Sequence, residues 1–447
     1  MTSIIPMRLR ALSALLGLGA ALNAQADIYT YPATDAPCNT TLQACVNGVN
    51  AADSIELHTD NHINEDVVIA KDLELRAAPG RRPSVRTVTA RASTDSAQVR
   101  VDGLTSFNGA SRVRGVLNPG GGDLVLYVVN SQLLGTALDS ALSIVTSNNA
   151  GSYGTAYLYA EGNTISQSGT NDYCAPAIQA IGLVSRLSID IFRNDVLATS
   201  LGQCAAISLY NGSPDLLSAR VHNNTVRGNG ADAGIMVRSG SRQMQAVVAG
   251  NLVAGGFDAG LRVSADNTNT VATVNLLNNT VVGTQHGLIA SARSDLGADI
   301  TGVVANNVFA RHPVFGMLIG DLPRLLDHHN LVFASPQFPG TRPYGPNTRH
   351  GNPSFANEAG ADYRLRANSD AIDHGDDGAV ESTHTLDLDG QPRRVRVVDM
   401  GAYEFQGTPM PRADGPITPV PATGPWALGW GAALLALVAG ARLRRRR

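Results

Sequence analysis

The sequence has few of the residues and motifs on which most enzyme mechanisms depend. Lys71 is the single lysine among 447 residues, which excludes most lysine-based chemistry. No Gly-x-Ser-x-Gly, phosphate-binding loop, Asn-Thr-Asp or Gly-His-Gly sequence occurs. Aromatic residues make up 5% of the chain and charged residues 16%, whereas 46 residues are glycine. This composition suits narrow coils with small turns, and a solenoid built from such coils avoids one oversized core.

Helical patterns are also missing from residues 161–333, where no ten-residue stretch places helix-forming residues at helical spacing. The segment instead repeats a short motif that starts with Asn and has an aliphatic or aromatic residue two positions later. Its Asn residues, at intervals of 31, 30, 27, 28, 28 and 23, are Asn163, Asn194, Asn224, Asn251, Asn279, Asn307 and Asn330. A second motif, such as Gly234-Ile235-Met236-Val237, lies between them. Because both motifs recur with the same period, the sequence predicts a solenoid.

Each period holds short alternating segments, such as Ala246-Val247-Val248, separated by Gly, Asn, Asp and Ser, which indicates strands and turns. We therefore predict an all-β chain: a right-handed parallel β-helix of nine or ten coils with three strands per coil. The Asn residues should stack at one turn, where Asn tolerates left-handed backbone angles and its amide can bond the copies above and below. A leucine-rich repeat is the alternative, because residues 187–196 fit its pattern, but that fold has one strand per repeat.

Both ends of the chain suggest export. Residues 1–26 combine Arg8 and Arg10 with a short apolar core and a small-x-small exit, which predicts a signal peptide cleaved between Ala26 and Asp27. Residues 407–425 are rich in proline, residues 426–441 are apolar, and five arginines lie in the last six positions. This apolar segment is shorter than the ~20 residues of an untilted span. We expect it to hold the protein in the membrane before processing, with the basic cluster on the cytoplasmic side.

The tail contains a five-residue motif made of Val420, Pro421, Ala422, Thr423 and Gly424. It resembles the sortase motif Leu-Pro-x-Thr-Gly, with Val in place of Leu. Together with the following Pro425-Trp426 it is also similar to Ile-Pro-Thr-Leu-type tails, which end in a Trp-led helix. Either resemblance implies a C-terminal sorting signal and a protein anchored at the cell envelope or surface.

The charge balance limits the partners. Seven of the 34 basic residues and none of the 37 acidic residues lie in the predicted signal peptide (1–26) and the C-terminal segment 426–447. The remaining chain then has a net charge near −10. Such a charge argues against nucleic acid and anionic membrane surfaces as partners, because both favour a basic face. We expect a monomer.

Four cysteines lie in the exported part, where disulfides persist. Cys174 and Cys204 follow successive repeat Asn residues by 11 and 10 positions, so they occupy nearly one slot on adjacent coils. Neighbouring strands lie about 4.8 Å apart, within reach of a disulfide. This predicts a Cys174–Cys204 bridge and leaves Cys38 and Cys45 to pair with each other; four free thiols are the alternative. The second pair flanks a short helix expected over 41–50, whose apolar stripe would cap the solenoid.

This opening resembles that of pectate-lyase-like bacterial surface proteins. Cys38, the segment 41–44 and the strand-like segment 55–57 carry the likeness. A more specific match follows the repeats, where four sequences occur in order: Asp362-Tyr363-Arg364-Leu365, then 369–375, then 387–393, then 399–404. They resemble the closing pattern of the choice-of-anchor Q family of bacterial β-helix proteins. That resemblance implies a β-helix followed by an alternative surface-sorting tail.

The predicted parts are a signal peptide (1–26), an N-terminal cap (27–54), the β-helix (55–350), the choice-of-anchor Q-like region (351–406), a Pro-rich linker with the sorting motif (407–425), and the hydrophobic segment with the basic tail (426–447). The choice-of-anchor Q-like region contains five acidic residues that could ligate calcium: Asp373, Asp387, Asp389, Asp399 and Glu404. The full calcium-loop pattern is missing and Asp-Gly is first a turn signal. We expect turns and a cap, with calcium as the alternative and no other cofactor. His328 and His329 precede Asn330 in an ordinary turn slot, and we assign them no chemistry.

Two carboxylates and two arginines mark one face of the predicted coils. Asp232 and Asp258 each lie two residues before the Gly that starts the second motif, on adjacent coils. Arg238 and Arg262 should point outward from the strands that follow. Paired carboxylates can act as acid and base or hold calcium, and an outward Arg can act beside a uronic acid. Because turns favour Asp, we predict a surface protein that binds glycans or has a structural role. A polysaccharide lyase or glycoside hydrolase that uses these four residues is the alternative.

Overall fold

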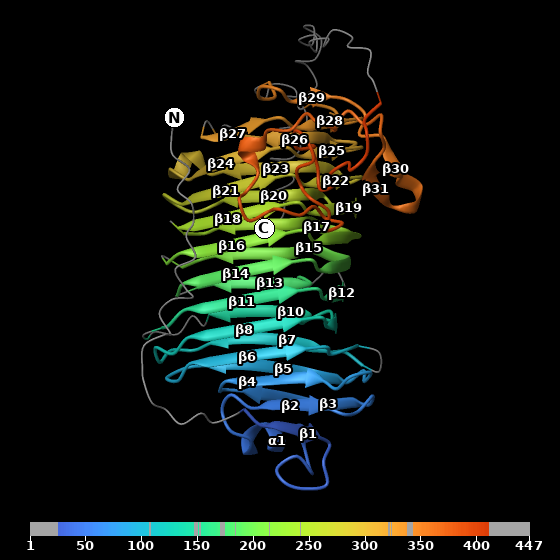
Figure 1. Cartoon of the computed structure of the whole chain (residues 1–447). Coiled ribbons are helices and arrows are strands. Elements are labelled where there is room, and N and C mark those ends of the chain that lie inside the picture. Colours follow the sequence, from blue (N-terminus) through green and yellow to red (C-terminus); the bar gives the residue numbers. More distant parts are fainter. Residues whose placement is uncertain are drawn as a thin grey trace.

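The chain folds into a parallel β-solenoid whose strands form three ladders stacked along one axis (Figure 1). The computed structural model describes residues 26–106, 109–146, 151, 153–169, 175–183, 185–213, 215–241, 243–320, 322, 324–337 and 343–410. The predicted parallel β-helix with three strands per coil is confirmed. The leucine-rich repeat is excluded, because each middle turn supplies one strand to every ladder.

The first ladder contains twelve strands: β1 (Ile28–Tyr31), β2 (Ser54–Leu57), β4 (Leu73–Ala77), β6 (Ala97–Asp102), β8 (Leu124–Val129), β11 (Ala156–Glu161), β14 (Leu187–Phe192), β16 (Leu217–His222), β18 (Met244–Ala249), β21 (Val271–Leu277), β24 (Asp299–Ala305) and β27 (Leu325–His328). The second ladder contains β9 (Gln132–Leu134), β12 (Thr164–Ser168), the first parts of β15 (Asp195–Asn211) and β17 (Thr225–Ser239), β19 (Leu252–Gly256), β22 (Thr280–Val282), β25 (Val308–Ala310), β28 (Leu331–Phe333) and β29 (Arg349–His350).

The third ladder contains β3 (His62–Ile69), β5 (Ser84–Ala92), β7 (Arg112–Leu117), β10 (Leu142–Thr146), β13 (Ile178–Gly182), the second parts of β15 and β17, β20 (Ala259–Ala265), β23 (His286–Ala292) and β26 (Phe315–Ile319). Its ten strands agree with the nine or ten predicted coils. A short 3-10 helix, η1 (Ser294–Leu296), lies between β23 and β24.

Strict alternation within the strands separates the core from the outer faces. In β16, Leu217, Ala219 and Val221 are buried, whereas the three residues between and after them are half-buried and point outward. Burying one large aliphatic side chain stabilises a fold by roughly 1.5–3 kcal/mol, so the inward positions fix the register of each turn. The outward positions are therefore free to carry function.

Buried asparagines link successive turns at the corner between the first and second ladders. Asn251 shows the pattern: its Oδ1 accepts hydrogen bonds from the backbone N–H of Asn224 at 3.0 Å and from Asn224 Nδ2 at 2.9 Å. Its Nδ2 donates to Asn279 Oδ1 at 3.0 Å and to the Val221 carbonyl at 2.8 Å. The same bonds connect Asn163, Asn194, Asn224, Asn251, Asn279, Asn307 and Asn330 in one chain. The predicted Asn stack is confirmed.

The left-handed backbone lies one residue before each stacked Asn rather than on it. This position, which we call the turn slot, is occupied by Gly162, Arg193, Asn223, Gly250, Asn278, Asn306 and His329, with φ between 50° and 66°. The prediction placed the left-handed angle on the stacked Asn and was wrong by one residue. The stacked Asn already uses its own N–H to bond the next Asn, so the residue before it makes the corner.

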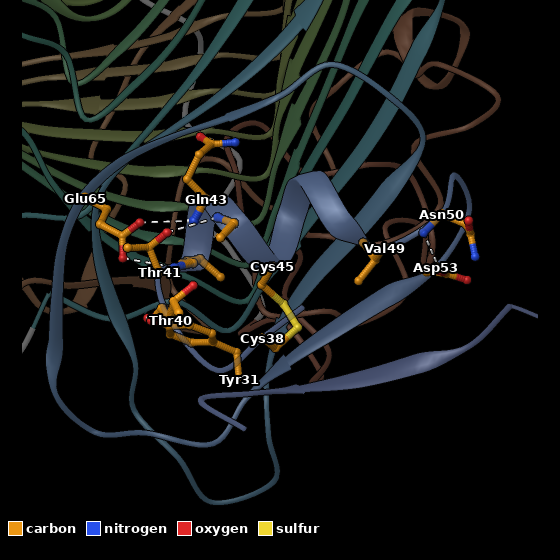
Figure 2. Close-up of a disulfide and its surroundings, with 12 residues drawn as sticks. Tyr31, Cys38, Thr40, Thr41, Gln43, Cys45, Val49, Asn50, Asp53 and Glu65 are labelled. Atoms are coloured by element: carbon orange, nitrogen blue, oxygen red, sulfur yellow. Dashed lines mark hydrogen bonds between the residues drawn. A yellow bond between two sulfur atoms is a disulfide. The ribbon is translucent and has the colours of Figure 1, made fainter. Parts of the chain in front are cut away.

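A short helix, α1 (Leu42–Gly48), covers the first turn of the solenoid and confirms the predicted cap. Thr41 caps its N-terminus, and Glu65 of β3 accepts two backbone N–H groups of its first turn at 3.0 Å (Figure 2). The predicted Cys38–Cys45 disulfide is present and anchors the helix to the preceding loop (Figure 2). β1, within the region expected to be cap alone, adds a strand to the first ladder.

Residues 351–410, which we call the C-terminal strap, run back along the side of the solenoid, shown from orange to red in Figure 1. The strap contains β30 (Phe355–Asn357), η2 (Glu358–Gly360), β31 (Asp362–Leu365) and η3 (Asp377–Ala379). Turn-slot side chains hold it by its backbone: Asn306 Nδ2 donates to Asp376 O at 3.0 Å and Asn278 Nδ2 to Asp399 O at 3.0 Å. Further down, Asn223 Nδ2 lies 3.2 Å from the Asp387 carbonyl. A region expected to cap one end therefore covers one edge instead.

Apolar packing reinforces this docking. The outward side chains of the last turns are apolar and form one buried cluster with the strap, which contains Val282, Val308, Ala310, Leu331, Phe355, Leu365, Ala371, Ile372 and Met400. Because these outer positions would otherwise be exposed, the strap replaces solvent on the second ladder over its C-terminal turns.

Several predictions fall on residues outside the described ranges. The signal peptide up to residue 25, the sorting motif at 420–424, the hydrophobic tail and Cys174 all lie there. Cys204 is buried in β15, and its pairing with Cys174 stays a prediction. In the part of the chain that is described, no helix has the length and apolar character required to cross a membrane.

Candidate functional site

Aromatic side chains form a column on the outer face of the first ladder. It consists of Tyr127 on β8, Tyr159 on β11, Phe192 on β14 and His222 on β16, all half-buried. Successive ring centroids lie 5.6, 5.1 and 4.9 Å apart, close to the strand spacing of about 4.8 Å. The last two rings are stacked, with 4° between their planes. We call these four residues the aromatic column.

Charged side chains hold the rings in place and border them. The Tyr159 hydroxyl donates to Glu161 Oε2 at 2.9 Å, and burial together with this carboxylate raises the pKa of Tyr159 to about 12. Asp190 Oδ1 lies 3.0 Å from His222 Nε2, and the same carboxylate is ion-paired with Arg220. The result is an apolar surface with fixed rings and adjacent carboxylates. Such a surface can make van der Waals contact with a sugar chain while the carboxylates accept hydrogen bonds from hydroxyl groups.

Sequence reasoning missed this column, although the repeat contains a signal for it. Two residues before the stacked Asn, one coil has Phe192 and the next has His222, whereas the following three coils have Ala249, Leu277 and Ala305. Those three small or aliphatic side chains are buried under the strap. Aligning the turns on their Asn residues therefore separates an open aromatic part of this face from a covered apolar part.

The predicted carboxylate and arginine face is only partly assembled. The Nη2 atom of Arg262 on β20 lies 3.0 Å from Asp232 Oδ1 and 2.6 Å from Asp258 Oδ2, so one guanidinium bridges both carboxylates. Arg238 does not join them, because it forms an ion pair with Asp266 at 2.8 Å on the next turn. The outward orientation predicted for both arginines is confirmed, since the side chain of Arg238 is 53% exposed and that of Arg262 is 22% exposed.

His286, at the start of β23, completes this cluster and was not predicted. Its Nδ1 donates to the Asp258 carbonyl at 2.9 Å and lies 3.6 Å from Asp258 Oδ1. The hydrogen bond from His286 and the charges of His286 and Arg262 lower the pKa of Asp258, whereas burial raises the pKa of Asp232. Two carboxylates whose pKa values move apart can serve as a proton donor and a proton acceptor.

The five acidic residues considered for calcium all lie in the strap. Asp387, Asp399 and Glu404 each accept two backbone N–H groups at distances of 2.6–3.2 Å. Asp373 is in an ion pair, and Asp389 is exposed. Among the described residues, the one group of His, Cys, Asp or Glu whose ligand atoms lie within 4.8 Å of one another contains none of these five. Their contacts favour the turn-forming role, and calcium binding stays a prediction.

A buried arginine explains why this acidic region is compact. Arg393 is 1% exposed and donates to the carbonyls of Gly401 at 3.0 Å and Ala402 at 2.8 Å. Glu404 Oε2 lies 3.9 Å from its guanidinium. Burial, followed by the charge of Asp399, raises the pKa of Glu404 to about 8, while burial raises that of Asp399 to about 6. Arg393 thus organises the turns of the strap.

A hollow of about 350 Å³ lies on the third ladder, on a different face from the aromatic column. Its lining consists of Asp66, Thr87, Thr89, Arg112, Arg114, Leu138, Asp139, Ser140, Ser143, Val145, Ala175 and Gln179. Because no aromatic ring lines it, the hollow lacks the flat apolar surface that the first ladder presents.

Comparison with known proteins gives three findings. Residues 203–320 match the sequence model of a family described as "Protein of unknown function (DUF1565)". No curated protein matches the chain. Among solved structures, the pectate lyase Pel9A is similar to this chain at 15% sequence identity and a TM-score of 0.45, over 85% of this chain and 96% of that one.

Proposed function

We propose that this protein is exported and binds a neutral polysaccharide along the aromatic column of the first ladder. The observation that carries the proposal is the uninterrupted series of four rings with centroid separations of 4.9–5.6 Å on an outer face. The rings follow the solenoid axis, so a chain of sugars can lie along them. The net charge near −10 of the exported part opposes an anionic chain, which favours a neutral one.

One further observation supports the exported form. The backbone N–H of Asp27 donates to Asp53 Oδ1 at 3.0 Å, and Asp53 is 4% exposed. Cleavage after Ala26 would turn this N–H into an ammonium group beside a buried carboxylate, which strengthens the contact. The tail with its sorting-like motif then attaches the solenoid to the cell envelope.

The binding test uses the purified protein and a panel of neutral and acidic polysaccharides measured by affinity electrophoresis and calorimetry. Phe192→Ala and Tyr159→Ala each remove one ring and should weaken binding of the neutral ligand about tenfold, the effect of about 1.4 kcal/mol. Gln245→Ala changes an exposed outward residue of the same ladder on β18 and should leave affinity unchanged. Unaltered affinity in both ring variants, with circular dichroism as for the native chain, would refute the site.

A second candidate function is polysaccharide cleavage at the cluster of Asp232, Asp258, Arg262 and His286. The observation in its favour is that one guanidinium, Arg262, bridges both carboxylates, whose pKa values also shift in opposite directions. The same polysaccharide panel, with and without calcium, is assayed for absorbance of unsaturated uronate and for released reducing ends. Asp258→Asn should abolish any turnover, whereas Asp266→Asn, an outward carboxylate nearby on the same ladder, should not. Binding without turnover of any polysaccharide supports the binding function alone.

A further inference from the structure

Two histidines and one aspartate meet where the last turns of the solenoid contact the strap. His328 ends β27 on the first ladder, and His329 occupies the next turn slot with φ of 50°. Asp376 belongs to the strap. Asn306, the turn-slot residue one turn earlier, fixes its backbone by accepting the Asp376 N–H at 2.7 Å and donating to the Asp376 carbonyl at 3.0 Å. The three side chains thus come from the solenoid and from the strap.

The donor atoms of these side chains face one another. His328 Nδ1 lies 2.9 Å from His329 Nδ1 and 3.8 Å from Asp376 Oδ2, and all three ligand atoms lie within 4.8 Å of one another. A tetrahedral zinc ion with bonds of about 2.0–2.2 Å holds its ligand atoms roughly 3.4 Å apart. The two measured separations fall on either side of that value, so small side-chain rotations bring all three atoms to one ion.

Each ligand is already oriented through its other polar atom. Gly378 N–H donates to Asp376 Oδ1 at 2.8 Å, which leaves Oδ2 directed toward His328. The side-chain amide of Asn347 lies 2.9 Å from His329 Nε2. With a metal on Nδ1, His329 carries its hydrogen on Nε2. The side-chain oxygen of Asn347 accepts this hydrogen when the amide is flipped, because amide oxygen and nitrogen are assigned from the hydrogen-bond network. Such outer partners are what hold histidine and carboxylate ligands in position.

The charge state of the histidines also suits a metal ligand. The two Nδ1 atoms face each other at 2.9 Å, and only one of them can carry a hydrogen without repulsion. The other Nδ1 therefore already directs its lone pair into the space between them. Neutral imidazole is the form that binds metal. The side chains of His328 and Asp376 are 22% and 38% exposed, which leaves solvent access for a further ligand.

We propose that His328, His329 and Asp376 bind one divalent transition-metal ion, with zinc as the favoured ion, and that this ion clasps the strap to the solenoid. Two imidazoles and a carboxylate form a borderline donor set that suits zinc better than magnesium or calcium. Water occupies the fourth position. The site is separate from the aromatic column and from the five acidic residues of the strap considered for calcium, and it does not depend on the proposed glycan binding.

The test uses the full chain without a histidine tag, first treated with a chelator and then titrated with Zn²⁺ by calorimetry and with Co²⁺ by visible absorption. One ion per chain and the intense visible bands of tetrahedral Co²⁺ are expected. Zn²⁺ should also slow hydrogen exchange of the strap around residues 374–380, because the ion fixes Asp376.

Two variants remove a ligand while keeping the local fold. His329→Asn introduces the residue that Asn278 and Asn306 already provide in the same turn slot, and Asp376→Asn retains an oxygen that can accept the Gly378 N–H. Each should weaken Zn²⁺ binding by more than about 100-fold, beyond the loss typical of outer partners, with unchanged circular dichroism. His58→Asn, a control near the other end of the solenoid, should bind as the native chain does. Stoichiometric binding that survives in either ligand variant, or no binding by the native chain, overturns the proposal.

Discussion

Replacing Asn251 with Ala should destabilise the solenoid more than most single substitutions do. Asn251 is fully buried in the middle of the Asn stack. Its Oδ1 accepts a hydrogen bond from the backbone N–H of Asn224 at 3.0 Å, and its Nδ2 donates to the Val221 carbonyl at 2.8 Å. Leaving one buried N–H without a partner costs about 1–3 kcal/mol, and the other lost hydrogen bonds cost about 1 kcal/mol more. We expect a loss of about 2–4 kcal/mol.

The measurement combines urea denaturation with hydrogen exchange of the backbone amide of Asn224. Because a solenoid can open turn by turn, exchange reports the local cost even where the global transition is broad. Thr225→Ala is the control: this half-buried residue points outward from β17, next to the Asn stack, and its loss should change stability by no more than about 0.5 kcal/mol.

An aspartate at the same position distinguishes the donor from the acceptor role. Asn251→Asp keeps Oδ1 but directs a carboxylate at Asn279 Oδ1 and the Val221 carbonyl, which Nδ2 contacts in the native chain. At pH 7 it should destabilise more than Asn251→Ala, and protonation at low pH should recover part of the loss. The reasoning is wrong if the Ala variant is as stable as the Thr225→Ala control, or if the Asp variant is the more stable of the two at pH 7.

Three further predictions concern the strap. Arg393→Met removes a buried cation among carboxylates and should destabilise the strap by about 3–5 kcal/mol, measured as faster limited proteolysis within residues 351–410. The pKa of His384 is lowered to about 3, chiefly by burial, so the unfolded chain binds the proton first. Native stability should therefore fall as pH drops from about 6.5 toward 3, by up to about 1.4 kcal/mol per pH unit, and His384→Gln should flatten this part of the pH profile in urea denaturation. Glu404 has the opposite sign: its pKa of about 8 means that the stability present below pH 4.5 is lost as pH rises through 8, and Glu404→Gln should abolish that loss in the same assay.

The repeat made most of the fold predictable. The regular Asn spacing and the second motif predicted the length of each turn. Alternation within each turn predicted which residues point inward, and three parallel ladders followed from both. The left-handed residue was misplaced by one position because amino-acid preference alone cannot separate the residue that makes a corner from the one that fills it. Arg193 occupies the turn slot despite a low preference for left-handed angles, so tertiary contacts outweigh preference there.

The sites were less predictable because they combine residues from different turns. Asp232 and Asp258 were found because the repeat copies their slot, and Arg262 was found because alternation along its strand directs it outward. His286 comes from the next turn, and no repeated slot pointed to it. Arg238 has the same outward orientation as Arg262, yet its pairing depends on Asp266. The strap is non-repetitive, and no periodicity relates its residues to the turns that they touch. Contacts such as His328 with Asp376 therefore emerge only from the folded chain.

The strap determines how much of the solenoid surface is available for binding. It follows the corner that contains the turn slots, and it covers the apolar ends of β18, β21 and β24 on one side and the outer face of β22, β25 and β28 on the other. Its His384 packs 6.1 Å from the ring of His222, the last member of the aromatic column. The column thus ends where the strap begins, because the same outward position changes from aromatic to small apolar residues at that turn. Opening of the strap would expose this apolar strip in line with the rings. A strap held by Arg393, the turn-slot asparagines and the proposed metal ion would therefore set the length of the proposed binding face.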